Sequence, residues 1–299
     1  MAGLTDYAAQ NALNWVSGAR SFPATASRFL SLWTTAPTSD AGTGGTEVSG
    51  TGYARVQVAG ALTLNVAFTT ASTTLSLASA APAWLTALGT GAGGNGVTVF
   101  DVTTGTQVGT VASISGSTVT LTAASSINSS GSTDSLIFSA FGASSASSGT
   151  EPSVTPAQAV NTAAVNFAQS TAAWGTVVAF GIHDAVTGGN FLGFDWLGAY
   201  KWSPFTCTSA SPGVLTCTDQ TFVNGQYAVV TSKFGGVLPT TAGSWAGVLT
   251  VAGVSGSTFN LGVNTTGTGD GLVRQVIQQV VPINNIVTFS ASALTFTAA

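Results

Sequence analysis

Charged side chains are scarce in this sequence, which has six Lys and Arg and ten Asp and Glu among its 299 residues. The charged fraction is 5%, whereas a typical soluble domain has roughly 25%. The surface must therefore consist mainly of hydroxyl, amide, glycine and apolar groups. With so little charge, electrostatic repulsion between copies of the protein is weak. Strands that mix polar and apolar residues with few charges tend to associate through their edges and faces. The composition favours a subunit that partners cover over a free monomer.

Basic residues are too few and too scattered for nucleic acid binding. The net charge at pH 7 is −4, and each cation stands alone in the sequence. A protein that neutralises phosphates needs a basic stripe or cluster. We therefore expect no nucleic acid partner. The six basic residues are Arg20, Arg28, Arg55, Lys201, Lys233 and Arg274.

Long apolar runs are also missing. Residues 56–100 contain no charge, but Gly, Thr, Ser and Pro interrupt every apolar stretch well before the ~18 residues of a membrane span. The N-terminus lacks the basic and apolar regions of a signal peptide and has Asp6 and Asn11 there instead. We therefore expect no membrane partner, and synthesis and assembly in the cytoplasm.

The sequence offers no constellation of catalytic residues. His183 is the only histidine, and a strand-end histidine beside Asp184 is more often a surface or satisfied core residue than a catalyst. No G-x-S-x-G motif precedes a helix, and no acidic pair has the spacing of a glycoside hydrolase. Residues 91–96 fit G-x-G-x-x-G, but a strand follows where a dinucleotide site needs a helix. We predict a protein that is not an enzyme and has no cofactor or metal.

Only two cysteines are present, and they flank the turn Ser211-Pro212-Gly213. A three-residue loop at that turn would pair Cys207 directly with Cys217. Opposite Cβ atoms in a non-hydrogen-bonded pair lie about 4.5 Å apart, near the upper end of disulfide geometry. Cytosolic disulfides are rare, so two reduced, half-buried thiols are an equal alternative.

Thr, Val, Ser and Gly dominate instead, which is typical of strands and turns. One segment predicts a helix: Thr5 or Asp6 can cap it, apolar residues recur at three- and four-residue spacing, and Gly18 ends it. The segments RFLSLWTTAP (28–37) and YARVQVA (53–59) predict strands around a long glycine-rich turn region.

Shifts in composition divide the chain. Cations are absent from about residue 60 to 156, and a Ser/Gly linker ends that segment. We predict a mainly β protein with an antiparallel, sandwich-like or barrel-like base domain and one N-terminal helix. Residues 1–60, 157–203 and 283–299 form the base, and two small β-domains are inserted at 61–156 and 204–282.

The two expected insertions share a local pattern. Ile114–Leu121 recurs as Val254–Leu261, each with a Ser-Gly turn between apolar strands. Such turns are common, so convergent hairpins and duplicated domains explain the likeness equally well.

Four segments of the expected base domain occur in an order that is hard to obtain by chance. They are LTDYAAQNALNWV (4–16), LSLWTTAPTSDAGTGGTEVSGTGYARVQV (30–58), NTAAVNFAQSTAAWGTVVAFGIHDAVTGGNFL (161–192) and FSASALTFTA (289–298). In this set the chain resembles small virion proteins of tailed bacteriophages, often labelled tail fibre or capsid decoration proteins. The resemblance covers about half of the chain, and the members it is similar to lack both insertions.

The resemblance implies a structural protein of the virion. Our leading expectation is a decoration or cement protein on the capsid exterior, assembled in the bacterial host cytoplasm, with the major capsid protein and two further copies of itself as partners. The alternative is a tail fibre or tail-tip protein that binds the host surface. By the same analogy, the expected capsid-contact residues are Leu4, Tyr7, Trp15, Arg20, Arg28, Tyr53 and Arg55.

Tryptophans in the second half of the chain allow a carbohydrate-stacking patch, although core or subunit packing is commoner for strand tryptophans. If the protein is a fibre, Trp245 or Trp84 in an exposed insertion is the expected contact with a host glycan. The four tryptophans of the candidate patch are Trp174, Trp196, Trp202 and Trp245.

Overall fold

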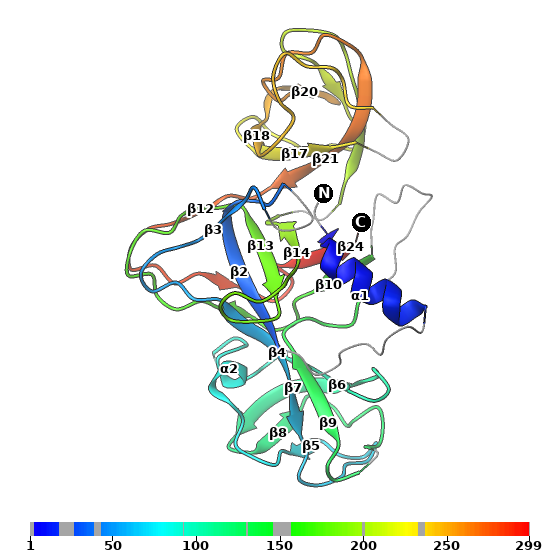
Figure 1. Ribbon diagram of the computed structural model, residues 1–299, viewed down its shortest axis with the longest axis vertical. Helices are drawn as coiled ribbons and strands as arrows, with labels where there is room; N and C mark the ends of the chain where they lie inside the picture. Colours follow the sequence, from blue (N-terminus) through cyan, green and yellow to red (C-terminus); the bar gives the residue numbers. More distant parts are fainter. Residues whose placement is uncertain are drawn as a thin grey trace.

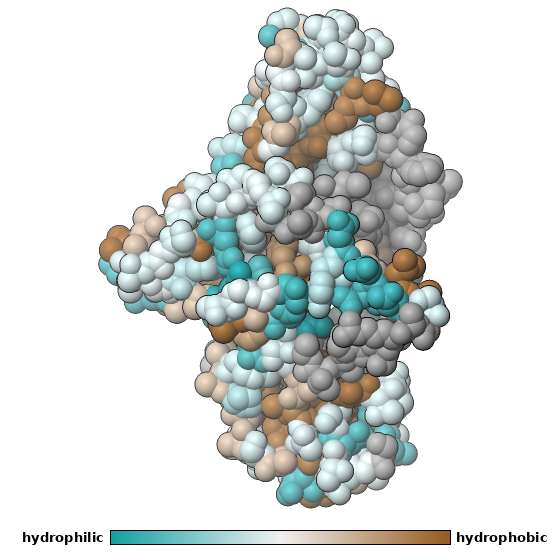
Figure 2. All heavy atoms as spheres, in the orientation of Figure 1, coloured by the Kyte–Doolittle hydropathy of each residue, from teal (hydrophilic) through white to brown (hydrophobic). Residues whose placement is uncertain are grey.

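The computed structural model describes residues 3–17, 27–38, 43–91, 93–129, 131–145, 157–198, 201–232 and 237–298, with the backbone alone at Trp15 and Ala298. It has a central region between two β lobes, and both chain ends lie near the central region (Figure 1). The prediction of a mainly β, antiparallel fold is confirmed. Figure 2 shows a face that is largely pale, with separate brown patches, as the low charge predicts.

The central region combines strands from distant parts of the sequence. Because four of the first six residues of the predicted strand 28–37 are apolar or aromatic, it forms the buried β2 (Arg28–Thr35). This strand pairs with β13 (Ala179–His183), β4 (Val56–Thr63) and β3 (Thr46–Glu47). The central strands are β1 (Gly3–Leu4), β2 (Arg28–Thr35), β3 (Thr46–Glu47), β10 (Ala157–Val160), β11 (Val165–Asn166), β12 (Gly175–Val177), β13 (Ala179–His183), β14 (Phe191–Trp196), β22 (Gln279–Val281), β23 (Thr288–Phe289) and β24 (Thr295–Ala298).

The first lobe continues the main sheet of the central region. Strand β4 (Val56–Thr63) leaves β2 and pairs with β9 (Ser135–Ser139), so the chain enters and leaves the lobe on adjacent strands. One hydrophobic core runs through both parts and includes Leu30, Phe138 and Val165. The other lobe elements are β5 (Thr74–Ser76), the short helix α2 (Ala83–Thr86), β6 (Thr98–Asp101), β7 (Gln107–Ser115) and β8 (Thr118–Leu121). Part of the expected Ser/Gly linker, residues 146–156, lies outside the described residues.

The second lobe has its own sheet and core. Its strands are β15 (Ser203–Cys207), β16 (Leu215–Thr216), β17 (Tyr227–Thr231), β18 (Leu249–Thr250), β19 (Ala252–Ser255), β20 (Thr258–Asn260) and β21 (Gly269–Val276). Its core contains Phe205, Leu215 and Phe259. Strand β22 falls within the range 204–282 expected for this insertion, yet it pairs with β12 of the central region.

The recurring Ser-Gly segments form the same hairpin in both lobes. Ser115 pairs with Thr118, and Ser255 pairs with Thr258. The glycine of each two-residue loop has a positive φ, 58° at Gly116 and 56° at Gly256. Two-residue hairpin loops need such left-handed positions, which glycine adopts without steric cost.

The predicted N-terminal helix is α1 (Asp6–Val16). The Thr5 hydroxyl accepts a 3.3 Å hydrogen bond from the Ala8 amide and donates one to the Phe191 carbonyl at 2.7 Å. Thr5 therefore caps the helix and fixes its start to β14. The expected stop, Gly18, lies outside the described residues. Leu13 and Val16 are largely exposed, so the helix end carries an uncovered apolar surface.

The predicted direct pairing of the cysteines is wrong. Cys207 pairs with Leu215, and the Thr208 amide donates to the Val214 carbonyl, so five residues form the loop instead of three. The loop is longer because the hydroxyl of buried Thr265 accepts from the Ala210 amide and donates to the Thr208 carbonyl. Cys217 is therefore diagonal to Cys207, at a spacing of about 7–8 Å that is too long for a disulfide. Both thiols are free and buried.

Candidate functional site

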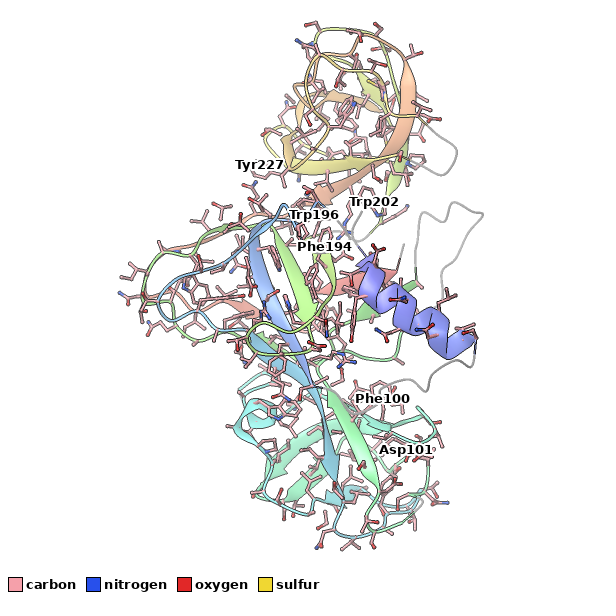
Figure 3. All side chains as sticks on the ribbon, in the orientation of Figure 1. Phe100, Asp101, Phe194, Trp196, Trp202 and Tyr227 are labelled. Atoms are coloured by element: carbon pink, nitrogen blue, oxygen red, sulfur yellow. The ribbon has the colours of Figure 1, made fainter. Side chains whose placement is uncertain are left out.

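A cleft of about 550 Å³ separates the central region from the second lobe. Its central wall comes from the end of β2 and the next residues, from β12 and from β14. Its opposite wall comes from β17 and from residues 245–248 before β18. Figure 3 shows Phe194, Trp196 and Trp202 at this junction, below the second lobe. We refer to it as the tryptophan cleft.

Three indoles line the tryptophan cleft. Trp202 is 7% exposed, whereas Trp245 and Trp196, whose ring lies edge-on to Phe194, are half-buried. The Trp245 indole N–H donates to the Pro239 carbonyl at 3.0 Å, which orients its ring. The structure thus brings together three of the four tryptophans of the expected patch.

The fourth tryptophan belongs elsewhere. Trp174 is buried in the central core, with its ring edge-on to Tyr53 and Phe167. Trp84, on α2, is partly buried against the core that the central region shares with the first lobe. Neither residue lines the tryptophan cleft.

A buried ion pair joins the two walls of the cleft. Asp195 of β14 forms an ion pair with Arg274 of β21, with 2.6 Å between Oδ1 and Nη1 and no exposure of either side chain. A second guanidinium nitrogen of Arg274 donates to the Trp196 carbonyl at 3.0 Å, and the guanidinium lies 5.7 Å from the Trp202 ring centroid. The other oxygen of Asp195 accepts from the Thr297 amide and hydroxyl. The pair therefore fixes two cleft tryptophans and the last strand together.

The sequence pattern gives no sign of this pair. Arg274 is one of six scattered cations in the sequence, and Asp195 lies 79 positions away from it. No sequence spacing signals the contact, because the two residues lie on strands of different sheets. The one available signal is an arginine within the apolar strand pattern of β21, a segment that is buried at four successive positions.

The polar groups of the cleft are uncharged. No Asp, Glu, Lys, Arg or His is among its lining residues in the described part of the chain. Threonine hydroxyls and the Gln278 amide supply polarity between the aromatic and aliphatic surfaces. Among the described residues, the side chains of Thr35, Thr176, Thr231 and Gln278 make no hydrogen bond, so these groups are open to a ligand.

A second pocket, of about 490 Å³, lies between α1 and the main sheet. It is largely apolar, and Leu4, Tyr7, Arg28 and Asp184 are among the residues around it. Burial lowers the pKa of Arg28, and the negative charge of Asp184 opposes that effect. Three expected capsid-contact residues therefore lie together, with Leu4 and Tyr7 each more than 40% exposed.

Tyr53 and Arg55, also expected at the capsid contact, are engaged inside the chain. Arg55 binds both carboxylate oxygens of Glu47 at 2.7 and 2.8 Å, and also donates to the Ala185 and Gly188 carbonyls. Burial raises the pKa of Glu47, but the Arg55 hydrogen bonds and charge outweigh it, so the pKa lies below its ordinary value. Burial also raises the pKa of Tyr53, whose hydroxyl bridges Glu47 and the Leu32 amide.

Two further residues were expected at the capsid contact. Of these, Arg20 and the side chain of Trp15 lie outside the described residues. The capsid contact as a whole stays a prediction.

His183 is a core residue of the central region. It is 4% exposed, lies parallel to Trp33, and has its Nε2 atom 3.0 Å from the Ser31 hydroxyl. Burial lowers its pKa to about 4, helped by the positive charge of Arg55 and opposed by Glu47 and Asp184. Near neutral pH the imidazole is therefore uncharged and enclosed.

The glycines of the G-x-G-x-x-G segment, between α2 and β6, have positive φ: Gly91, Gly93, Gly94 and Gly96. A strand follows the segment, as the sequence predicts. Within the described part of the chain, no group of three metal-ligating side chains comes together. No helix there has the length and apolar character needed to cross a membrane.

The comparison with protein families links this geometry to known proteins. A family model described as "Podophage GP4 fiber I protein gp80" matches residues 3–140 and also residues 78–202. Together the two ranges span residues 3–202, about two thirds of the chain. Residues 78–140 are in both ranges, so the match extends through most of the first lobe and ends immediately before β15 of the second.

These observations define a structural protein of a bacteriophage virion. More closely, the chain belongs to the podophage GP4 fiber I protein gp80 family. The resemblance to phage virion proteins is thus confirmed, and the family description names a fibre. The comparisons with curated proteins and with solved structures gave no match.

Proposed function

We propose that this protein is a tail fibre protein through which the phage contacts the surface of its bacterial host. The observation that carries the proposal is the family match over residues 3–202, because the family description is that of a fibre protein. The protein acts by binding, without catalysis and without a cofactor or metal. The first lobe and the central region, which the match covers up to residue 202, attach to the virion, and the second lobe faces outward.

Capsid decoration, our leading expectation from the sequence, is the competing assignment. The scarcity of charge supports it, because it favours a subunit covered on several sides. The apolar pocket beneath α1 and the exposed Leu13 and Val16 also offer a surface for a capsid subunit or for another copy of the chain, including the expected trimer. These features fit attachment of a fibre equally well, so they do not favour decoration over it.

Copy number distinguishes the two assignments. Quantitative mass spectrometry of purified particles gives the ratio of this chain to the major capsid protein. A fibre is present in a handful of copies, near one per hundred capsid subunits, on the order expected for a symmetric tail appendage. A ratio near one to one, or another simple lattice fraction, would refute the fibre assignment and establish decoration.

Removal of the second lobe tests the host contact. The Ile277 amide donates to the Leu197 carbonyl at 2.8 Å, so the chain enters and leaves this lobe at adjacent points. A short Gly/Asn turn can therefore replace residues 198–276. The deletion also removes Arg274, so it is made together with Asp195→Asn, which avoids an unpaired buried charge. Full-length Asp195→Asn/Arg274→Met is the matched control, because it likewise leaves no unpaired buried charge.

A phage whose fibre lacks the lobe should assemble but adsorb poorly to its host. If the deleted particles adsorb as well as the control and instead lose resistance to heat, the protein stabilises the capsid and the proposal is wrong. Incorporation of the shortened chain, measured by mass spectrometry, verifies that it still folds and attaches.

A further inference from the structure

We propose that the tryptophan cleft binds a neutral pyranose sugar. The proposal rests on the proposed fibre function only for the biological source of the sugar, a polysaccharide of the host surface. The binding chemistry follows from the cleft alone, whose volume of about 550 Å³ lies within the range of about 300–1,000 Å³ of small-molecule sites.

The aromatic surface of the cleft matches one face of a sugar ring. Trp196 and Trp245 are half-buried on opposite walls, so each indole presents part of its surface to the cleft. Trp202 also lines the cleft but is nearly covered, and the Arg274 guanidinium lies near its ring. The apolar C–H face of a pyranose packs well on such rigid aromatic surfaces.

The polar groups match the hydroxyls of a sugar. Thr176 and Gln278 line the cleft and make no side-chain hydrogen bond within the described part of the chain. The indole N–H groups of Trp196 and Trp202 are likewise without a hydrogen bond there. A ligand that offers several donors and acceptors satisfies all of these groups, which a purely apolar ligand leaves unpaired.

The charge of the cleft selects against acidic sugars. Among the residues that the structure describes, no charged side chain lines it, and the guanidinium of Arg274, which lies near the Trp202 ring, is already neutralised by Asp195. A carboxylate or sulfate placed in the cleft would lose its hydration without gaining a cationic partner. Neutral hexoses therefore bind better than uronic or sialic acids.

The cleft geometry is held in place by the structure and does not depend on the sugar. The Asp195–Arg274 pair joins the wall that carries Trp196 to the lobe that carries Trp245. The hydrogen bond from Trp245 to Pro239 fixes the third indole. Such preorganisation lowers the entropic cost of binding a small ligand.

The test is a titration of the purified full-length protein with methyl pyranosides. The neutral probes are the glucoside, galactoside, mannoside and rhamnoside, and the acidic probes are methyl glucuronide and sialic acid. Tryptophan fluorescence reports binding, because the cleft holds three indoles. We expect a saturable change with at least one neutral probe and about tenfold weaker binding, or none, with the acidic probes. The absence of a saturable change with every neutral probe, or equal binding of acidic probes, overturns the proposal.

Two tryptophan variants localise the site. Trp245→Ala removes an indole of the cleft, and we expect it to weaken the best neutral probe about tenfold or more. Trp84→Ala is the matched control, because it removes a partly buried indole from the first lobe and leaves the cleft intact. Thermal unfolding of both variants verifies folding. Unchanged affinity in Trp245→Ala, or an equal loss in Trp84→Ala, overturns the assignment to the cleft.

Adsorption competition separates this inference from the fibre proposal. Purified protein is added to host cells before the phage. If wild-type protein and Trp245→Ala block adsorption equally, the fibre function holds and the cleft is not the receptor site. If the wild type binds neutral sugar but blocks nothing, the cleft assignment holds and the fibre function fails. We expect only the wild type and Trp84→Ala to block.

Discussion

Arg274 and Asp195 form a fully buried ion pair, 2.6 Å from Nη1 to Oδ1, between the second lobe and the central region. The contact lies beneath the tryptophan cleft, because Arg274 also binds the Trp196 carbonyl and faces the Trp202 ring. Removal of one partner leaves a buried charge without compensation, whereas removal of both does not. The pair is therefore expected to couple the stability of the two parts.

We predict that Arg274→Met lowers the free energy of unfolding by about 3–5 kcal/mol. The double variant Asp195→Asn/Arg274→Met should recover part of that loss, since no unpaired charge remains. Lys201→Met is the control: its pair with Asp219 is 3.5 Å long and about half exposed, and such pairs contribute less than about 1 kcal/mol. Urea unfolding followed by tryptophan fluorescence measures all three. Equal losses in Arg274→Met and Lys201→Met would contradict the prediction.

His183 makes stability depend on pH below neutrality. In the unfolded chain the imidazole has a pKa near 6.5, while in the fold burial lowers its pKa to about 4. Between these values the unfolded state binds a proton and the folded state does not. His183 therefore contributes stability above pH 6.5 that is lost as the pH falls to 4, by at most about 3 kcal/mol.

His183→Gln removes this titration and keeps a group able to bond the Ser31 hydroxyl. The stability of the wild type should fall more steeply than that of the variant between pH 6.5 and 4. Glu47 and Asp184 titrate in both proteins, so the difference isolates His183. Parallel stability curves would show that the histidine is solvated in the fold. An NMR titration of its ring protons gives the pKa directly.

Gly181 lies where β13 crosses the aromatic cluster around His183. A Cβ atom there would be 2.7 Å from both Phe191 Cε2 and Trp33 Nε1, and 2.8 Å from Ser31 Oγ. Because three neighbours from two strands must move, we expect Gly181→Ala to cost about 1–3 kcal/mol. Gly105→Ala probes a turn glycine with open space around it but a φ of 68°, where about 1 kcal/mol is expected from backbone strain alone. A neutral Gly181→Ala variant, measured by chemical unfolding, would rule out the close packing.

The two thiols should be unreactive and unlinked in the native protein. Burial raises the pKa of Cys217 to about 11, and the negative charge of Asp219 adds to this effect. Burial also raises the pKa of Cys207. At pH 8 about one Cys217 side chain in a thousand is then a thiolate, the form that alkylating reagents attack.

Iodoacetamide labelling at pH 8 should therefore be slow for native protein and fast in denaturant, with two thiols labelled per chain. Intact mass before and after reduction provides the independent check. A gain of two hydrogen atoms on reduction would show a disulfide and would require a register other than Cys207 opposite Leu215.

Local patterns in the sequence predict the local structure well. The α1 helix begins at Asp6, directly after the Thr5 cap. The β2 strand begins at Arg28, where the predicted strand begins, and the two Ser-Gly segments form matching hairpins. These features depend on neighbours within a few residues, such as a capping hydroxyl or a glycine with positive φ. The scarcity of charge and the motifs shared with phage proteins can likewise be recognised from the sequence alone.

The candidate site was predicted only in part. The sequence grouped Trp196, Trp202 and Trp245 as aromatic residues of one region, but it equally grouped Trp174, which packs in the central core. Which indoles share a cleft depends on how β14 and the second lobe meet. That arrangement is set by contacts between residues about 80 positions apart in the chain, such as Arg274 and Trp196.

The sequence by itself determined the β class, the start of the helix, the hairpin turns and the membership in a phage fibre family. The tertiary structure alone decided the cysteine register, because Thr265 holds the loop from a distant strand. It also decided the burial of His183, the Asp195–Arg274 pair and the cleft. Each of these arises from long-range packing, where side chains become neighbours only after the sheets assemble, and no spacing in the sequence encodes such a meeting.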